Sequence, residues 1–177
     1  MLEGARVRLR DWREADRAPY AALNADPAVR EYFTGLMTRA ECDAQIDRFA
    51  AHLAQYGFGF WALEIPGVAD CAGFVGLKHL GDTDPIGPGV EIGWRLARAA
   101  WGQGYATEAA RLCVDFAFRQ LGLPELLAWT AAVNQPSRRV MQRLGMVLAR
   151  EFDHPRIPPG HPLRPHVLYR LQGPAAL

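Results

Sequence analysis

The chain has 177 residues, of which 50% are hydrophobic and 22% are charged, a composition that suits one globular domain with a single core. Its 20 Lys and Arg residues balance its 19 Asp and Glu residues to a net charge of +1. This balance excludes the broad basic surface that is typical of nucleic-acid binders. We therefore predict a single domain over residues 1–177 that binds no nucleic acid.

Cysteine usage and hydropathy predict the compartment. Cys42, Cys71 and Cys113 are odd in number and far apart, which favours neither a disulfide framework nor a zinc site. The charged start, MLEGARVRLRDW, has no apolar core of a signal peptide. No run of about 18 apolar residues is present, so no membrane span is expected. These features predict a cytoplasmic protein.

Hydrophobic periodicity, caps and breakers divide the chain into eleven elements. Residues 6–11 alternate apolar side chains with arginines, as a half-buried strand does. Thr38 and Glu41 form a capping box at the start of one helix, and Gly57 ends that helix. In chain order the expected elements are strand 6–11, helices 13–24 and 38–56, strands 58–65, 71–80 and 90–96, helix 104–121, strand 126–133, helix 135–144, and strands 146–152 and 166–171.

The order of these elements predicts the fold class. It reads β-α-α-β-β-β-α-β-α-β-β, with three successive strands in the middle that are expected to form an antiparallel meander. We therefore predict an α/β protein with a mixed, mostly antiparallel central sheet that is flanked by helices.

The turn before the long helix reads WGQGYATEA from Trp101, and we call residues 101–107 the glycine loop. Gly102 and Gly104 allow a sharp turn and a close approach of the backbone to a ligand. The free N–H groups of the first helical turn and the helix dipole then form a site for an anion such as a phosphate. Ala106 is small enough to let the ligand approach, and Thr107 can add a hydroxyl group.

Other phosphate-binding motifs fit the glycine loop less well. The P-loop pattern GxxxxGK[ST] does not occur in the chain. The dinucleotide fingerprint GxGxxG is a near match, but Thr107 stands where the third glycine is needed. The antiparallel meander before the loop also argues against a doubly wound sheet. Nucleotide binding is therefore the less favoured alternative.

Four segments together carry a family resemblance. They are RVRLRDWREAD at the start, VEIGW followed by WGQGYATEA, Asn134-Gln-Pro-Ser137 with Leu144-Gly145-Met146, and His166-Val-Leu-Tyr169 near the end. In this order they resemble the GNAT acetyltransferase superfamily, and within it the branch of ribosomal-protein N-terminal acetyltransferases. The resemblance covers nearly the whole chain. It implies the GNAT fold and an N-acetyltransferase that uses acetyl-CoA.

The resemblance also implies where acetyl-CoA binds. Backbone N–H groups of the glycine loop would hold the pyrophosphate, and the strand edge before it would pair with the pantetheine arm and polarise the thioester carbonyl. Asn134 would bond the pantetheine. The implied residues are Trp94, Arg95, Leu96, Gly102, Gln103, Gly104, Tyr105, Ala106, Thr107 and Asn134.

Two positions depart from the wider superfamily. Trp101 stands where Arg or Gln is usual, although the branch tolerates Trp. Met141 stands where a tyrosine often acts as the acid for the leaving thiolate, so Ser137 is the only candidate for that role. Helix capping is the alternative role for both Asn134 and Ser137, with Pro136 just inside the helix. Arg138 and Arg139 could reach CoA phosphates or be solvated helix residues.

Glu91 is the candidate general base. It lies ten positions before Trp101, near where the superfamily often places a glutamate base. The amine must lose a proton, which is easier for an α-amine with a pKa of about 7.7–8.0 than for a lysine at about 10.4. A surface glutamate, or one paired with an arginine, is the alternative reading of Glu91.

The acceptor amine is left open by the sequence. Residues 26–38, with Tyr32 and Phe33, and residues 153–165 are the segments expected to wall the acceptor site. A peptide N-terminus predicts an open groove there, and a small amine predicts a closed, acidic pocket. A non-catalytic acyl-CoA sensor is the alternative to an enzyme. A homodimer is possible, because relatives often pair.

The late histidines raise the question of a metal. His154, His161 and His166 fit no common zinc spacing, so we expect no metal. We expect His161 and His166 to line the acceptor mouth or to shape the proline-rich loop.

Overall fold

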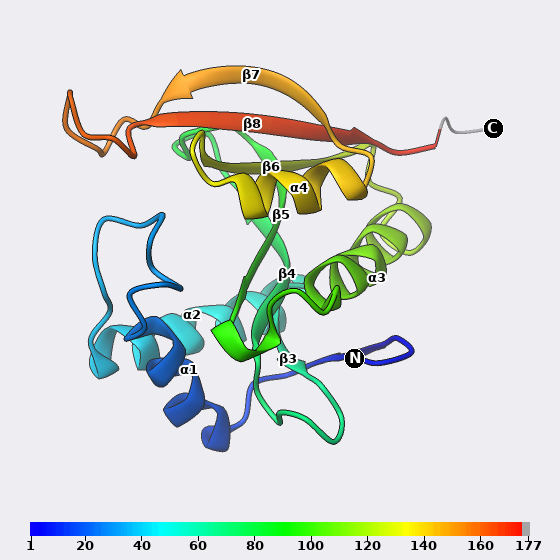
Figure 1. Ribbon diagram of the computed structural model, residues 1–177. Coiled ribbons are helices and arrows are strands. Elements are labelled where there is room, and N and C mark those ends of the chain that lie inside the picture. Colours follow the sequence, from blue (N-terminus) through cyan, green and yellow to red (C-terminus); the bar gives the residue numbers. More distant parts are fainter. Residues whose placement is uncertain (175–177) are drawn as a thin grey trace.

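A computed structural model describes residues 1–174, and its strands form one eight-stranded sheet (Figure 1). The sheet order is β1-β2-β3-β4-β5-β6-β8-β7, and every neighbouring pair is antiparallel except β5 with β6. The strands are β1 (Leu2–Glu3), β2 (Arg8–Arg10), β3 (Phe60–Glu64), β4 (Gly73–Leu80), β5 (Gly89–Leu96), β6 (Glu125–Ala131), β7 (Val147–Asp153) and β8 (Pro165–Gln172).

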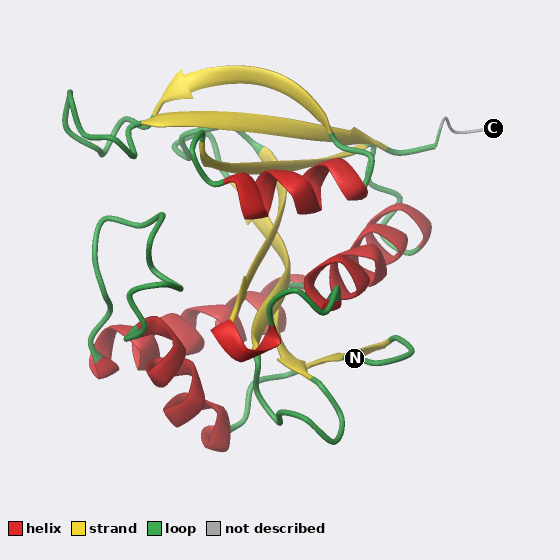
Figure 2. Ribbon diagram, viewed as in Figure 1, coloured by secondary structure: helices red, strands yellow, loops and turns green. Residues whose placement is uncertain are grey.

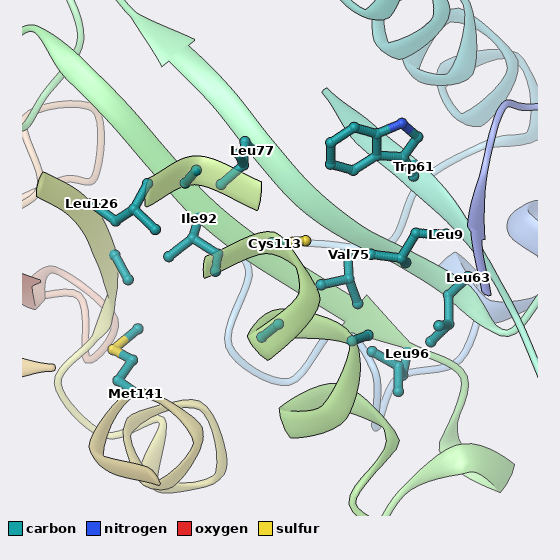
Figure 3. Close-up of a cluster of buried hydrophobic side chains, with 14 of the residues drawn as sticks. Leu9, Trp61, Leu63, Val75, Leu77, Ile92, Leu96, Cys113, Leu126 and Met141 are labelled. Atoms are coloured by element: carbon teal, nitrogen blue, oxygen red, sulfur yellow. The ribbon is translucent and has the colours of Figure 1, made fainter. Parts of the chain in front are cut away.

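Helices cover both faces of the sheet (Figure 2). Phe60 and Phe74 pack against α1 and α2 on one face. Val75 and Ile92 belong to the core that α3 and α4 cover on the other, shown in Figure 3. The helices are α1 (Arg17–Asn24), α2 (Arg39–Tyr56), α3 (Tyr105–Arg119) and α4 (Gln135–Arg143), with short 3-10 helices η1 (Glu14–Asp16) and η2 (Arg98–Ala100). Within residues 1–174, no helix combines the length and the apolar character needed to cross a membrane.

The predicted fold class and the central meander are confirmed, and so is the capping box. The Thr38 side chain accepts a bond from the Glu41 N–H, and Gly57 ends α2 in the left-handed conformation at φ 73°. The two-residue strand β1 was not predicted, because it is too short to show alternation. Arg10 also differs from the expected solvent-facing arginine. It is 4% exposed and pairs with Asp16 at 2.7 Å, which fixes the end of η1 to the sheet.

The central strands diverge, and this divergence positions the site. Strand β5 pairs with β4 along its whole length, but its register with β6 contains one pair, Glu91 with Leu127. Beyond Glu91, β5 runs away from β6 toward the α1–α2 end of the molecule (Figure 1). The β6-facing edge from Ile92 to Leu96 therefore has no strand partner among the described residues.

Candidate active site

A cavity of about 1220 Å³ lies where β5 and β6 diverge. Its walls come from the α1–α2 segment, α2, β4, β5, the glycine loop, β6, α4 and the β7–β8 segment. Of the predicted site residues, Gln103 is absent from its lining. The others that line it are Glu91, Trp94, Arg95, Leu96, Gly102, Gly104, Tyr105, Ala106, Thr107, Asn134 and Ser137.

The glycine loop has the backbone conformation that its sequence predicts. Gly102 and Gly104 have φ values of 74° and 83°, in the left-handed region that favours glycine. Gly104 is the N-cap of α3 and offers no capping side chain. The first N–H groups of α3, at Tyr105 and Ala106, therefore remain available to a ligand.

Arg6 supports the glycine loop from the far end of the sequence. Its backbone N–H and Nε donate to the Glu108 carboxylate at 2.7 and 2.8 Å, and its Nη1 donates to the Gln103 carbonyl at 3.1 Å. The guanidinium also lies 5.0 Å from the centre of the Tyr105 ring. Arg6 thus offsets the negative charge of Glu108 at the N-terminus of α3, where an anion would bind.

Sequence reasoning missed this role of Arg6. The alternating arginines of residues 6–11 look alike, and nothing local distinguishes the one that reaches α3. The pairing depends on a separation of 102 residues, which only the folded chain brings together. The acidic residue in the first turn of α3 was the available signal, because a basic partner is needed there if an anion is to bind.

Trp101 closes the start of the glycine loop. Its indole Nε1 donates to the Leu96 carbonyl at 2.9 Å, although the residue as a whole is 45% exposed. The bond ties the loop to the end of β5. The tryptophan at the first loop position therefore has a structural role, which is to hold the glycine loop against the end of β5.

Asn134 caps α4, as the alternative reading expected. Its Oδ1 accepts from the Ser137 N–H at 3.2 Å, and its Nδ2 donates to Thr130 Oγ1 at 2.9 Å. Ser137 is half-buried and lines the cavity one turn before Met141, which is 2% exposed in the core. Arg138 is not the solvated residue that its position suggested, because it donates to the Ala132 carbonyl at 2.9 Å.

Glu91 lies in the cavity wall, on the face of β5 that looks toward α1 and α2. Desolvation of its carboxyl raises the pKa to about 7, against the opposing effect of the Lys78 charge. Its Oε1 would lie 3.7 Å from a Cβ placed on Gly93, so the carboxylate leans along the strand. Among the described ion pairs none joins Glu91 to an arginine. The half-buried side chain faces the cavity, and the base role of Glu91 stays a prediction.

Two buried donors that face this cavity lack hydrogen-bond partners. They are Arg95 Nε and Trp129 Nε1, which belong to residues that both line the cavity. A buried polar group without a partner costs on the order of 1–3 kcal/mol, so native proteins rarely keep one without a reason. Their location indicates that a ligand or water completes the site.

Two of the late histidines, His154 and His166, flank Trp129. The rings of His154 and His166 lie 5.3 and 5.4 Å from the indole, and burial lowers the pKa of both imidazoles. His166 lines the cavity, and His161 shapes the adjoining loop by accepting from the Leu163 N–H at 3.1 Å. Within residues 1–174, no group of three or more His, Cys, Asp or Glu side chains is arranged to hold a metal ion.

Comparison with known proteins identifies the family. The sequence model of the GNAT acetyltransferase domain matches residues 6–147. The chain belongs to the GNAT acetyltransferase family. It is therefore an acetyl-CoA-dependent acyltransferase, and the resemblance expected from the four segments is confirmed.

Relatives and solved structures agree over most of the chain. The protein YkkB of Bacillus subtilis is 30% identical over 80% of this chain and 81% of its own length. An acetyltransferase from Agrobacterium tumefaciens is 28% identical, with a TM-score of 0.78 over 97% of this chain and 93% of that one. The ribosomal L7/L12 α-N-protein acetyltransferase RimL, solved with coenzyme A, shares the fold at a TM-score of 0.77 over 96% of both chains, with 15% identity.

Proposed function

We propose that this protein transfers an acetyl group from acetyl-CoA to a primary amine by direct attack in a ternary complex. The observation that carries the proposal is Glu91, a half-buried carboxyl with its pKa raised to about 7, in the cavity wall where β5 parts from β6. A general base works best when its pKa lies near the operating pH.

The diverging strands and the glycine loop fit acetyl-CoA. The loop offers unpaired N–H groups at the start of α3 for the pyrophosphate, and Thr107 adds a hydroxyl group. The open edge of β5 at Trp94, Arg95 and Leu96 has backbone groups with which the pantetheine can pair as an added strand. Asn134, the N-cap of α4, lines the same cavity.

Acetyl-CoA is the acyl donor in this reaction. The amine nitrogen would bond to its thioester carbon while the bond from that carbon to sulfur breaks. A backbone N–H of the β5 edge donates to the thioester oxygen and stabilises the charge that develops there. Glu91 accepts the proton that the amine loses, directly or through water. Ser137 can donate a proton toward the departing sulfur. Most of the rate comes from positioning and from the backbone N–H groups.

A non-catalytic sensor would keep the glycine loop without chemistry. It would have no need for a carboxyl that is held near neutrality in the cavity wall, since burying that group costs stability. The enzyme reading therefore accounts for a feature that the sensor reading leaves unexplained.

The test follows free thiol release from acetyl-CoA with a panel of primary amines, for wild type and for Glu91→Gln. The expected result is amine-dependent thiol release that Glu91→Gln lowers at every pH. If no amine raises thiol release while acetyl-CoA still raises the melting temperature, the chain is a sensor and the proposal is wrong.

A further inference from the structure

On the acceptor side, Arg95 lines the cavity and Arg30 lies just outside its lining, and the described partners of both are neutral groups. The guanidinium groups of Arg30 and Arg95 lie 4.2 and 4.4 Å from the centre of the same ring, Phe33. Within the described residues, neither of them forms a salt bridge, and burial, followed by the nearby charge of Arg95, lowers the pKa of Arg30 to about 10. Two mutually repelling cations in a partly buried site leave an unbalanced positive charge.

Arg95 is held in place through one nitrogen only. Its Nη1 donates to Asn24 Oδ1 at 2.8 Å and to Gln45 Oε1 at 3.4 Å. Phe74 lies below the guanidinium, at 5.4 Å from its ring centre. The Nε side is buried and has no partner, although Nε is one of the two donors that form a bidentate pair with a carboxylate.

Most of the charged side chains that line the cavity are basic. Its carboxylates are Glu31 and Glu91, whereas its basic side chains are Arg48, Lys78, Arg95, Arg139, Arg143 and Arg156. Arg48 stands on α2, on the Arg95 side. The acidic pocket that a polyamine or an aminoglycoside requires is therefore missing from the described walls.

The alternation of β5 separates Arg95 from the CoA phosphates. Trp94 and Leu96 pack into the core under α3, whereas the Arg95 side chain lies among residues of α1, α2 and β4 on the other face. Glu91 and Arg95 are on the same face, about 13 Å apart along the strand, with Gly93 between them. The Phe60 ring packs over Gly93, since an added Cβ there would meet that ring at 3.1 Å.

We propose that the acceptor is a primary amine that also carries a carboxylate, and that the free edge of the Arg95 guanidinium binds this carboxylate. The inference rests on the proposed acetyl transfer and names the acceptor class for the same site. Arg30 adds positive potential from behind the Phe33 ring. Either a free amino acid or a peptide N-terminus with an acidic side chain supplies this chemistry.

The test compares each acid with its uncharged amide as acceptor for wild-type protein. One arm uses free amino acids against amino acid amides, and the other uses N-terminal Asp peptides against the same peptides with Asn. We expect a kcat/KM ratio of acid to amide of about 30 or more in one arm. The arm that shows it identifies whether a free amino acid or an acidic peptide N-terminus supplies the carboxylate. An α-carboxylate favours the charged, unreactive form of the neighbouring amine, so amine ionisation works against such a preference.

Variants assign the preference to Arg95. Arg95→Gln should lower the ratio to about 3 or less, and Arg95→Lys should restore part of it, since a salt-bridged carboxylate loses most of its affinity when its partner is removed. Arg98→Gln, at an exposed arginine in η2 outside the cavity, should keep the wild-type ratio. If Arg95→Gln does not fold, Arg30→Gln should still lower the ratio several-fold.

Two results would overturn the inference alone. They are equal rates for acids and amides in both arms, and a preference for cationic amines. In either case some amine is still acetylated, so the proposed function stands. Absence of transfer to every amine, with acetyl-CoA still bound, would instead remove the proposed function itself.

Discussion

The two ends of the cavity are built from different parts of the chain. The acetyl-CoA end is made largely of backbone, from residues 94–107 and the start of α4. The acceptor end is made of side chains from the α1–α2 segment, α2 and the β7–β8 segment, which are far apart in sequence (Figure 1). Backbone sites need particular φ values and small residues, which short motifs encode. Side-chain sites depend on long-range packing.

Glu91→Gln should have the largest effect, because Glu91 stands where the two ends meet. Removing a general base lowers the rate by about 10²–10⁴-fold. In wild type, kcat/KM should rise with pH through about 7, as the raised pKa of Glu91 is passed and the carboxylate forms. The variant should lack this limb of the pH profile.

Glu31→Gln is the matched control, since Glu31 is the other carboxylate that lines the cavity and it is exposed. The kcat/KM of Glu31→Gln should still rise with pH through about 7. A wild-type profile that is flat between pH 5.5 and 8, or one that Glu31→Gln flattens as well, would remove Glu91 from the base role.

Gly104→Val should disable the acetyl-CoA end alone. A β-branched side chain at φ 83° is strained, and its Cβ would stand 3.5 Å from Arg6 Nη2 at the mouth of the anion site. We expect acetyl-CoA affinity, measured by calorimetry, to fall by about 30-fold or more, which corresponds to about 2 kcal/mol. Gly122→Val is the control, because Gly122 has φ 61° and no atom near its Cβ position. Equal losses in both variants would mean that only fold stability had changed.

Arg6→Ala should have a smaller effect on the same end. It leaves the Glu108 carboxylate without its partner beside the anion site, and a helix-terminal charge of this kind is worth about 0.3–1 kcal/mol. The KM for acetyl-CoA should therefore rise about 2- to 5-fold, with kcat kept. Arg8→Ala, on the same segment but paired with Glu3, should leave the KM unchanged. An unchanged KM in Arg6→Ala would reduce Arg6 to a structural contact.

The difference between the two ends also explains what the sequence could predict. The capping box at Thr38 and the glycine loop were predictable, because each is decided within a few residues. Glu91 could be placed because it precedes the loop on one strand. The order of the strands along the chain followed from periodicity, apart from the two-residue β1.

The long-range partners of arginines were not predictable. Arg6, Arg10 and Arg95 look alike in sequence, yet they pair with Glu108, Asp16 and Asn24 respectively. For Arg6 and Arg95 the partner is 102 and 71 residues away. Strand alternation gives the face on which a side chain lies, but the helix that packs on that face decides which group it meets.

Ser137→Ala should have the smallest effect, and it tests how much the leaving group needs an acid. A thiol with a pKa near 8.5 leaves readily as the thiolate, so a proton donor gains little. Met141, buried in the core one turn further on, offers no donor in place of Ser137. We expect kcat to fall by about threefold or less, because the Asn134 cap on the Ser137 N–H uses the backbone and survives the substitution. A fall of 100-fold in kcat, without a change in acetyl-CoA affinity, would instead assign Ser137 as the acid.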